Sequence, residues 1–207
     1  MRLLARLRAG AYDGLLARSE AAGLAARRAQ LLEQAGGRVL EVGAGTGLNL
    51  RHYPPEVELT LTEPDAAMRA KLQHRVRRLQ GPVKIVDARA EQLPLANSSF
   101  DTVVSTFVFC SVEDPAQAGA EIQRVLKRDG TLLLLEHVRS SNPRVARRQD
   151  ALHRPWRVVS GGCHCNRETV NLLADAGFRV SELEHSAIPN APAFLRPLAF
   201  GAATPDV

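Results

Sequence analysis

Five short apolar segments alternate with helical stretches through the middle of the chain. They are residues 38–43, 58–63, 83–88, 100–109 and 131–138. Apolar strands separated by helices are typical of a parallel sheet that is covered on both faces. The sequence therefore predicts an α/β fold with a mostly parallel seven-stranded sheet, helices on both faces and an antiparallel edge.

The stretches between these segments carry helical periodicity and helix start signals. Met68, Leu72, Val76 and Leu79 recur at helical spacing, which predicts a helix after the second apolar segment. Asp114 is followed directly by a proline, and this pair predicts the first residues of another helix after the fourth segment.

A glycine-rich turn follows the first apolar segment. Gly43, Gly45 and Gly47 form a G-x-G-x-G pattern, in which the missing Cβ atoms let backbone N–H groups approach a ligand. Leu48 occupies the position where a dinucleotide fingerprint needs glycine, and the lysine of a P-loop is absent. The turn alone indicates only a nucleotide-binding fold, because many such folds share it.

Two acidic residues follow the next two apolar segments. Glu63 ends the second segment and can accept hydrogen bonds from both hydroxyls of a ribose. Asp87 ends the third segment and can accept from the exocyclic amine of adenine. Open α/β sheets bind their ligands at the carboxyl ends of the strands, so the turn and the two acids predict an adenosine site.

This set of residues resembles the S-adenosylmethionine-dependent methyltransferases of the Rossmann-like class I fold. The stretches VLEVGAGTGLNLRHYP, TFVFCSVEDP, RVLKRDGTLLLLEHV and RPWRVVSGGCHCNRET are more specific. Together they resemble the methyltransferase-like 7 family of thiol S-methyltransferases and its bacterial relatives.

The resemblance implies an enzyme that uses S-adenosylmethionine and releases S-adenosylhomocysteine. It implies direct in-line transfer of a methyl group to a small-molecule acceptor, for which a thiol is one candidate. A quinone or phospholipid methyltransferase is an alternative, and a noncatalytic S-adenosylmethionine-binding regulator is another. The residues expected to bind the cofactor are Tyr12, Gly43, Ala44, Gly45, Gly47, Asn49, Glu63, Pro64, Met68, Asp87, Ala88, Thr106 and Phe107.

The resemblance places the acceptor beside the ends of the fourth and fifth apolar segments. His137 is the candidate general base, although it could instead hydrogen-bond a neighbouring loop. Cys110, Trp156 and Cys163 are the candidate acceptor-binding residues, and direct transfer needs no covalent intermediate on a cysteine.

The sequence predicts one methyltransferase domain over residues 1–207. Residues 1–37 are expected to form N-terminal capping helices, and residues 38–138 the cofactor-binding core. Residues 139–166 interrupt the alternating pattern and predict a substrate-side insertion. Residues 167–207 are expected to form the last helix and the edge strands, with Asn166 as the helix cap and Glu168 in its first turn.

The segment GGCHCNRETV contains two of the three cysteines on either side of a histidine. Zinc needs about four ligands, and in an extended chain Cys163 and Cys165 face away from His164. We therefore predict a turn that lines the acceptor pocket, and no metal.

Arginine dominates the basic residues, which number 27 against 22 acidic ones. Because aromatic residues make up only 4% of the chain, base stacking is disfavoured and no nucleic-acid partner is expected. The arginine-rich segments 69–78 and 139–157 leave open a peripheral contact with a membrane surface. An odd number of cysteines and no export signal predict a cytoplasmic protein, and the sequence leaves the oligomeric state open.

Overall fold

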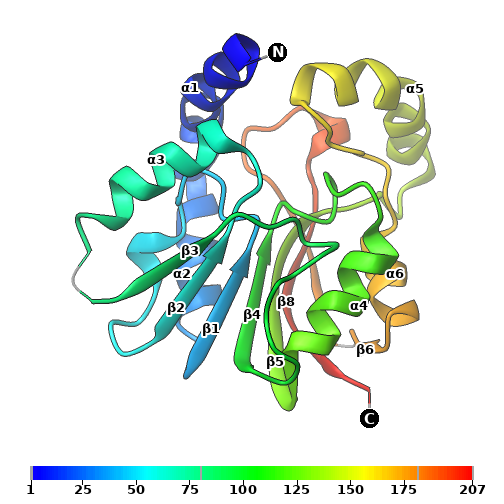
Figure 1. The fold of residues 1–207 in the computed structure, drawn as a ribbon. Helices are drawn as coiled ribbons and strands as arrows, with labels where there is room; N and C mark the ends of the chain where they lie inside the picture. Colours follow the sequence, from blue (N-terminus) through cyan, green and yellow to red (C-terminus); the bar gives the residue numbers. More distant parts are fainter. Residues whose placement is uncertain (1, 80, 181, 207) are drawn as a thin grey trace.

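A computed structural model describes residues 2–79, 81–180 and 182–206 (Figure 1). One mixed sheet runs through the molecule in the order β3-β2-β1-β4-β5-β8-β6, and β7 also pairs with β8. The strands are β1 Arg38–Val42, β2 Glu58–Thr62, β3 Val83–Val86, β4 Phe100–Thr106, β5 Leu126–His137, β6 Phe178–Arg179, β7 Glu184–Ala187 and β8 Pro197–Pro205.

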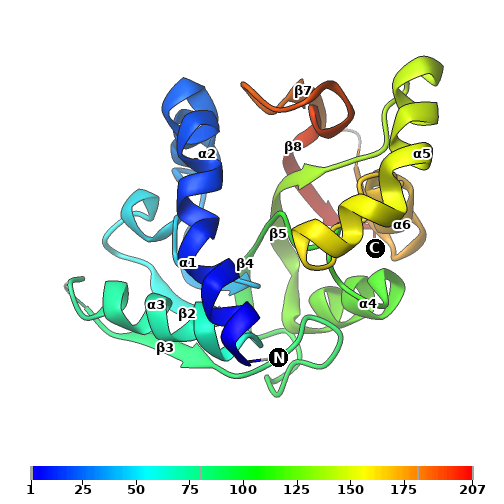
Figure 2. The ribbon, with the colours of Figure 1, turned by 90° about the horizontal axis from the view of Figure 1, so that it is seen from above.

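Helices lie on both sides of this sheet (Figures 1 and 2). The helices are α1 Arg2–Ser19, α2 Ala25–Leu32, α3 Ala66–Val76, α4 Pro115–Val125, α5 Pro143–Ser160 and α6 Thr169–Asp175. A kinked segment, Glu20–Leu24, joins α1 to α2, with Gly23 in a non-helical conformation at φ 126°. Short 3-10 turns occupy Leu50–His52 and Ala193–Leu195. The predicted Rossmann-like α/β fold is confirmed.

From β1 the chain adds β2 and β3 on one side of the sheet and then returns to add β4 and β5 on the other side of β1. β1 pairs in parallel with β2 on one side and with β4 on the other, so that Val42 lies opposite Ser105. Connections that leave β1 and β4 in opposite directions open a crevice at the carboxyl ends of these strands. The glycine turn follows β1 directly, and so it lies at this crevice.

The middle strands are buried on both faces. Leu132 and Leu134 of β5 belong to a core shared with Ile122 of α4, whereas Leu133 and Leu135 belong to a second core shared with Leu31 of α2. Successive side chains of a strand point to opposite faces, which explains why the sequence shows an unbroken apolar run.

The antiparallel edge contains one more strand than predicted. β8 pairs with β5 on one side, and both β6 and β7 pair with its other side. Gly201 of β8 has φ 136°, and a Cβ there would lie 2.8 Å from the carbonyl oxygen of Glu182. The outer side of β8 is thus covered by two short strands, and the described part of the chain forms a sheet of eight strands, one more than the seven expected.

Of the two helix starts for which the sequence predicts cap residues, one is confirmed and one is wrong. The Asp114 side chain accepts from the N–H of Gln117 and caps α4 as predicted. The prediction that Asn166 caps the last helix is wrong, because its side chain donates to Asp150 instead. Glu168 occupies the N-cap position of α6, without a side-chain cap hydrogen bond.

Candidate cofactor and acceptor site

The glycine turn after β1 adopts backbone conformations that favour glycine. Gly43 and Gly45 both have φ 58°, and Gly47 has φ 84°. A Cβ on Gly43 would lie 2.8 Å from Val108, and one on Gly47 would lie 2.8 Å from Leu50. At Gly45 the nearest heavy atom would be 4.0 Å away. Gly43 and Gly47 are therefore needed for packing, and Gly45 faces open space.

A small cavity of about 20 Å³ lies beside this turn. Six of the predicted cofactor residues line it together, and four further residues that the prediction omitted complete its wall. The predicted six are Tyr12, Gly43, Ala44, Gly45, Asn49 and Thr106, and the other four are Arg28, Glu41, Thr46 and Leu48.

A buried polar network forms the floor of the cavity. Asn49 donates to Glu41 Oε1 at 2.8 Å and to Thr106 Oγ1 at 3.0 Å, and it accepts from Arg28 Nη1 at 2.8 Å. The Tyr53 hydroxyl donates to Glu41 Oε2 at 2.8 Å. Burial raises the pKa of Glu41 to about 7. The floor thus offers one guanidinium and one carboxyl group held close together.

Only one of these two charged residues carries a signal in the sequence. Glu41 interrupts an otherwise apolar strand directly before the glycine turn, and a charge at such a position indicates a functional or paired group. Arg28 belongs to α2 and is buried, with only 2% of its surface exposed. Its place in an arginine-rich helix gave no sign that it reaches the cavity.

Glu63 follows β2 and holds the glycine turn. Its Oε2 accepts from the N–H of Gly45 at 2.7 Å, and its Oε1 accepts from the N–H of Asp65 at 2.8 Å. Burial raises the pKa of its carboxyl group above the ordinary range. Each oxygen keeps a second lone pair, so the side chain can still accept from ribose hydroxyls, as predicted for it.

The predicted adenine side of the site is more exposed. Asp87 follows β3, and its Oδ2 lies 2.6 Å from Arg69 Nη2. Arg69 also donates to the carbonyl oxygen of Glu63 at 2.6 Å. Met68 lies in the first turns of α3, Pro64 follows Glu63, and Ala88 is buried. Contacts of these residues with adenine stay predictions.

Phe107 begins the segment after β4 with an unusual backbone conformation. Its φ of 59° is uncommon for a residue with a side chain, and such residues concentrate at functional sites. Its ring lies 5.5 Å from the guanidinium carbon of Arg28. The two residues therefore link the floor of the cavity to the end of β4.

Helix α1 is fastened over the glycine turn. Asp13 Oδ1 accepts from the Thr46 hydroxyl at 2.6 Å, and Asp13 Oδ2 lies 2.7 Å from Arg75 Nη2. Arg75 also donates to the carbonyl oxygen of Thr46 at 2.8 Å. Tyr12 lines the cavity next to this contact, and burial raises its pKa to about 12. The sequence indicated Tyr12 but not Asp13 or Arg75.

The predicted acceptor residues lie together at the ends of β4 and β5. His137 ends β5, is 3% exposed, and has its Nδ1 3.5 Å from Cys163 Sγ. The N–H of His164 donates to the carbonyl oxygen of Cys110 at 2.6 Å. Trp156 lies close enough to the Cys163 thiol to help lower its pKa. The structure brings these residues together, and their contact with an acceptor stays a prediction.

The cysteine-rich turn sends its three side chains to three different partners. Cys163 faces His137, His164 lies 2.9 Å from His153, and the Cys165 thiol donates to the carbonyl oxygen of Gln149. Within residues 2–79, 81–180 and 182–206, no three His, Cys, Asp or Glu side chains are grouped to hold a metal ion.

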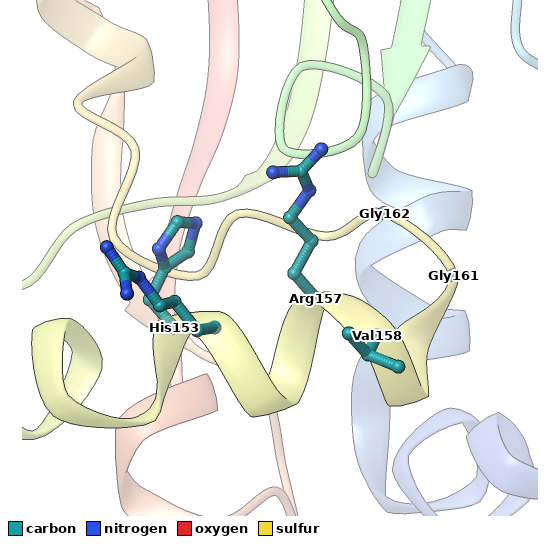
Figure 3. Close-up of a pocket in the computed structure, with 6 residues that line it drawn as sticks. His153, Arg157, Val158, Gly161 and Gly162 are labelled. Atoms are coloured by element: carbon teal, nitrogen blue, oxygen red, sulfur yellow. The ribbon is translucent and has the colours of Figure 1, made fainter.

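A larger cavity of about 560 Å³ lies against α5 and this turn (Figure 3). Its lining mixes cationic and apolar groups, and the labelled residues in Figure 3 come from the last turns of α5 and the two glycines after it. The lining residues are His153, Arg154, Arg157, Val158, Gly161 and Gly162.

The reversed strand order, the glycine turn and the acid after β2 define a Rossmann-like S-adenosylmethionine-dependent methyltransferase. The family model described as a methyltransferase domain matches residues 40–134. A solved structure from Thermotoga maritima, a SAM-dependent methyltransferase and possible histamine N-methyltransferase, superposes with a TM-score of 0.73 over the whole of both chains. At 21% identity that likeness shows the fold alone.

The curated relatives identify the family more closely. The thiol S-methyltransferase TMT1B of Rattus norvegicus is 37% identical over 73% of this chain and 64% of that protein. The chain belongs to this family, and it also matches 67% and 68% of the human proteins TMT1B and TMT1A. The match thus spans about two thirds of these relatives. A phosphatidylethanolamine N-methyltransferase of Cereibacter sphaeroides is 33% identical over 75% of this chain and 77% of its own length.

Proposed function

We propose that this protein transfers a methyl group from S-adenosylmethionine to a small-molecule thiol. The observation that carries the proposal is the grouping of Cys110, His137 and Cys163 at the ends of β4 and β5, next to the strand end that closes the cofactor cavity. Sulfur groups are polarizable, so this wall suits a soft thiol acceptor.

The cavity residues fit the charged end of S-adenosylmethionine. The methionine part carries one carboxylate and one ammonium group, and the cavity floor supplies Arg28 and Glu41. Arg28 uses Nε for Glu20 and Nη1 for Asn49 and Thr106, and its Nη2 has no hydrogen-bond partner in the described part of the chain. Arg28 would bind the carboxylate, Glu41 the ammonium group, and Glu63 the ribose.

The protein's own contribution to the reaction is orientation and the exclusion of water. When bound, S-adenosylmethionine supplies a methyl group on a sulfonium, which a nucleophile displaces in line. A thiol with a pKa near ~8.5 is already partly ionised at neutral pH, so a modest base is sufficient. His137 Nε2 is buried and has no partner among the described residues. We infer that this nitrogen accepts the acceptor's proton.

The larger cavity beside α5 offers a route for the acceptor. Its volume of about 560 Å³ is within the range of small-molecule sites. Gly161 and Gly162 line it and lead directly into Cys163. An acceptor that enters along this cavity would therefore meet the cysteine turn first.

A lipophilic acceptor is the second candidate, and α5 carries the observation that favours it. Val158 and Val159 are 79% and 72% exposed, and Arg154 and Arg157 line the neighbouring cavity. Apolar groups beside cations are typical of a surface that contacts anionic membranes. Among the described residues no helix is long and apolar enough to cross a bilayer, so this contact would be peripheral.

An acceptor screen tests both candidates. The purified full chain is incubated with S-adenosylmethionine and a panel of thiols, phenols, quinols and aminophospholipid vesicles, and S-adenosylhomocysteine is measured. We expect turnover with thiols that depends on His137. Turnover only with aminophospholipids would replace the thiol proposal by the second candidate. Cofactor binding by calorimetry without turnover on any acceptor would indicate a noncatalytic regulator.

A further inference from the structure

Two segments that carry cysteines are held side by side at the acceptor end of the sheet. The N–H of His164 donates to the carbonyl oxygen of Cys110 at 2.6 Å. Arg167 donates to the carbonyl oxygens of Phe109 and Val112, and so ties the region after the turn to the same segment. The positions of Cys110 and Cys163 are therefore fixed by backbone contacts on both sides.

The two thiols have different surroundings. The neighbouring Cys110 thiol and His137, whose Nδ1 lies 3.5 Å from Cys163 Sγ, hold the pKa of the Cys163 thiol well below its ordinary value. The neighbouring Cys163 thiol and burial raise the pKa of the Cys110 thiol, whose Sγ lies 3.6 Å from the carbonyl oxygen of Phe107. Cys163 is thus the thiol that ionises first, and Cys110 keeps its proton beside it.

Other charged groups face this pair from the elements around it. Glu136 of β5 lies under the Cys110 segment and opposes ionisation of Cys110. The Arg167 guanidinium is close enough to interact with both thiols and with Glu136. The His164 ring also interacts with Cys163, while its Nδ1 lies 2.9 Å from His153 Nε2.

Cys163 is partly exposed and directly follows two residues that line the larger cavity. It is half-buried, whereas Cys110 is almost completely buried. Gly161 and Gly162, which precede Cys163, line the cavity shown in Figure 3. A reactive thiol that is accessible, next to a protonated thiol that is not, is the arrangement of an attacking and a resolving cysteine.

We propose that Cys163 and Cys110 form a redox-active dithiol that reduces low-molecular-weight disulfides. The Cys163 thiolate attacks one sulfur of R–S–S–R, which forms Cys163–S–S–R and releases R–S⁻. Cys110 then loses its proton and attacks Cys163 Sγ, which forms the Cys110–Cys163 disulfide and releases the second R–S⁻. The two cysteines lose two electrons and two protons in total, and the disulfide leaves as two R–SH molecules. These steps do not depend on methyl transfer.

Cys165 provides a matched control in the same turn. It is fully buried, its thiol donates to the carbonyl oxygen of Gln149, and burial raises its pKa to about 11. It lies two residues from Cys163 but has neither the histidine contact nor the accessible position. The proposal therefore assigns the reaction to Cys163 and predicts that Cys165 takes no part.

The test uses the reduced full chain and oxidised glutathione under anaerobic conditions, with intact mass, peptide mapping and released glutathione as readouts. We expect a disulfide between Cys110 and Cys163 and release of two glutathione molecules per chain. Cys110→Ser should accumulate glutathione on Cys163, and Cys165→Ser should react as the unmodified chain does. Cys163→Ser should not react, and S-adenosylhomocysteine binding by each variant checks its fold.

Three results would overturn the proposal. They are stable glutathione attachment to Cys163 in the unmodified chain without a cross-link, loss of the reaction in Cys165→Ser, and absence of any reaction in the folded, reduced chain. His137→Asn provides a further check, because it should slow the first step several-fold at neutral pH and much less at alkaline pH. An equal rate at both pH values would remove His137 from the dithiol.

Discussion

The backbone N–H of Gly45 donates to Glu63 Oε2 at 2.7 Å, and this bond joins the turn after β1 to the acid after β2. The acid predicted to bind the ribose therefore also fixes the turn predicted to approach the methionine part. One side chain prepares two parts of the same ligand site, and its loss should affect both.

Replacing Glu63 tests that double role. Glu63→Ala should weaken S-adenosylhomocysteine binding by roughly 1.5 to 3 kcal/mol, the usual contribution of hydrogen bonds to a charged group. Glu63→Gln keeps an acceptor for the Gly45 N–H and should lose less. Calorimetry measures both variants, and unchanged affinity of the alanine variant would refute the assignment to the cofactor site.

Arg28 is expected to recognise the carboxylate of the cofactor. Arg28→Lys keeps the charge but loses the planar fork, so binding of S-adenosylhomocysteine should weaken by roughly tenfold or more, about 1.4 kcal/mol. Binding of methylthioadenosine, which has no carboxylate, should change little. Equal losses for the two ligands would instead indicate a purely structural role for this buried residue.

The contact between Asp13 and Thr46 is expected to control entry of the cofactor. The cavity under α1 is about 20 Å³, far less than a ligand site of roughly 300 Å³ or more, so we predict that α1 moves when the cofactor binds. Asp13→Ala should increase both the association and the dissociation rates of S-adenosylhomocysteine in stopped-flow measurements. Leu15→Ala lies on an exposed part of the same helix and is the control. Identical rates in all three proteins would mean that α1 does not limit entry.

Two buried carboxyl groups predict the pH dependence of stability. Burial raises the pKa of both Glu41 and Glu136 from 4.5 to about 7. Between these values the folded protein binds more protons than the unfolded chain, so these groups lower the free energy of unfolding as the pH rises. Between pH 4.5 and 7, the free energy of unfolding of Glu136→Gln should therefore decline by roughly 1 to 3 kcal/mol less than that of the parent protein. Denaturant titrations at several pH values measure it, and parallel curves for variant and parent would contradict it.

His137 is expected to act in turnover and not in cofactor binding. His137→Asn should lower kcat at neutral pH by roughly tenfold, less than the usual 10²-fold contribution of a general base because the acceptor thiol is already partly ionised, while S-adenosylhomocysteine affinity stays constant. Raising the pH should restore part of the rate, because the acceptor thiol then ionises by itself. The same rate in variant and parent at every pH would exclude His137 as the base.

The sequence predicted those parts of the fold that depend on local patterns. Leu132 to Leu135 face two cores in turn, so their unbroken apolar run correctly indicated a strand buried on both faces. The acid after β2 was predicted because its position relative to the glycine turn follows from the order of the strands. The division of the outer edge into β6 and β7 was not predicted, because it depends on which residues pair with β8 and not on a local sequence pattern.

The residues that the sequence missed are those that reach the site through tertiary contacts. Arg28 arrives from α2, and its partners Asn49 and Thr106 lie 21 and 78 positions away. Asp13 and Arg75 meet only because α1 crosses α3 over the glycine turn. Asn166 fitted the pattern of a helix cap, but Asp150 of α5 offered its amide a charged partner.

The side of β8 that faces away from β5 is covered by two short strands, β6 and β7, and this arrangement has a consequence for solubility. Strands at the borders of a sheet present unpaired N–H and C=O groups, which can recruit other chains. β8 is long, but β6 and β7 cover its outer side in separate pieces of two and four residues. β3, at the opposite border, has four residues. Neither border offers a long straight strand, so the architecture resists sheet-to-sheet aggregation through its own geometry.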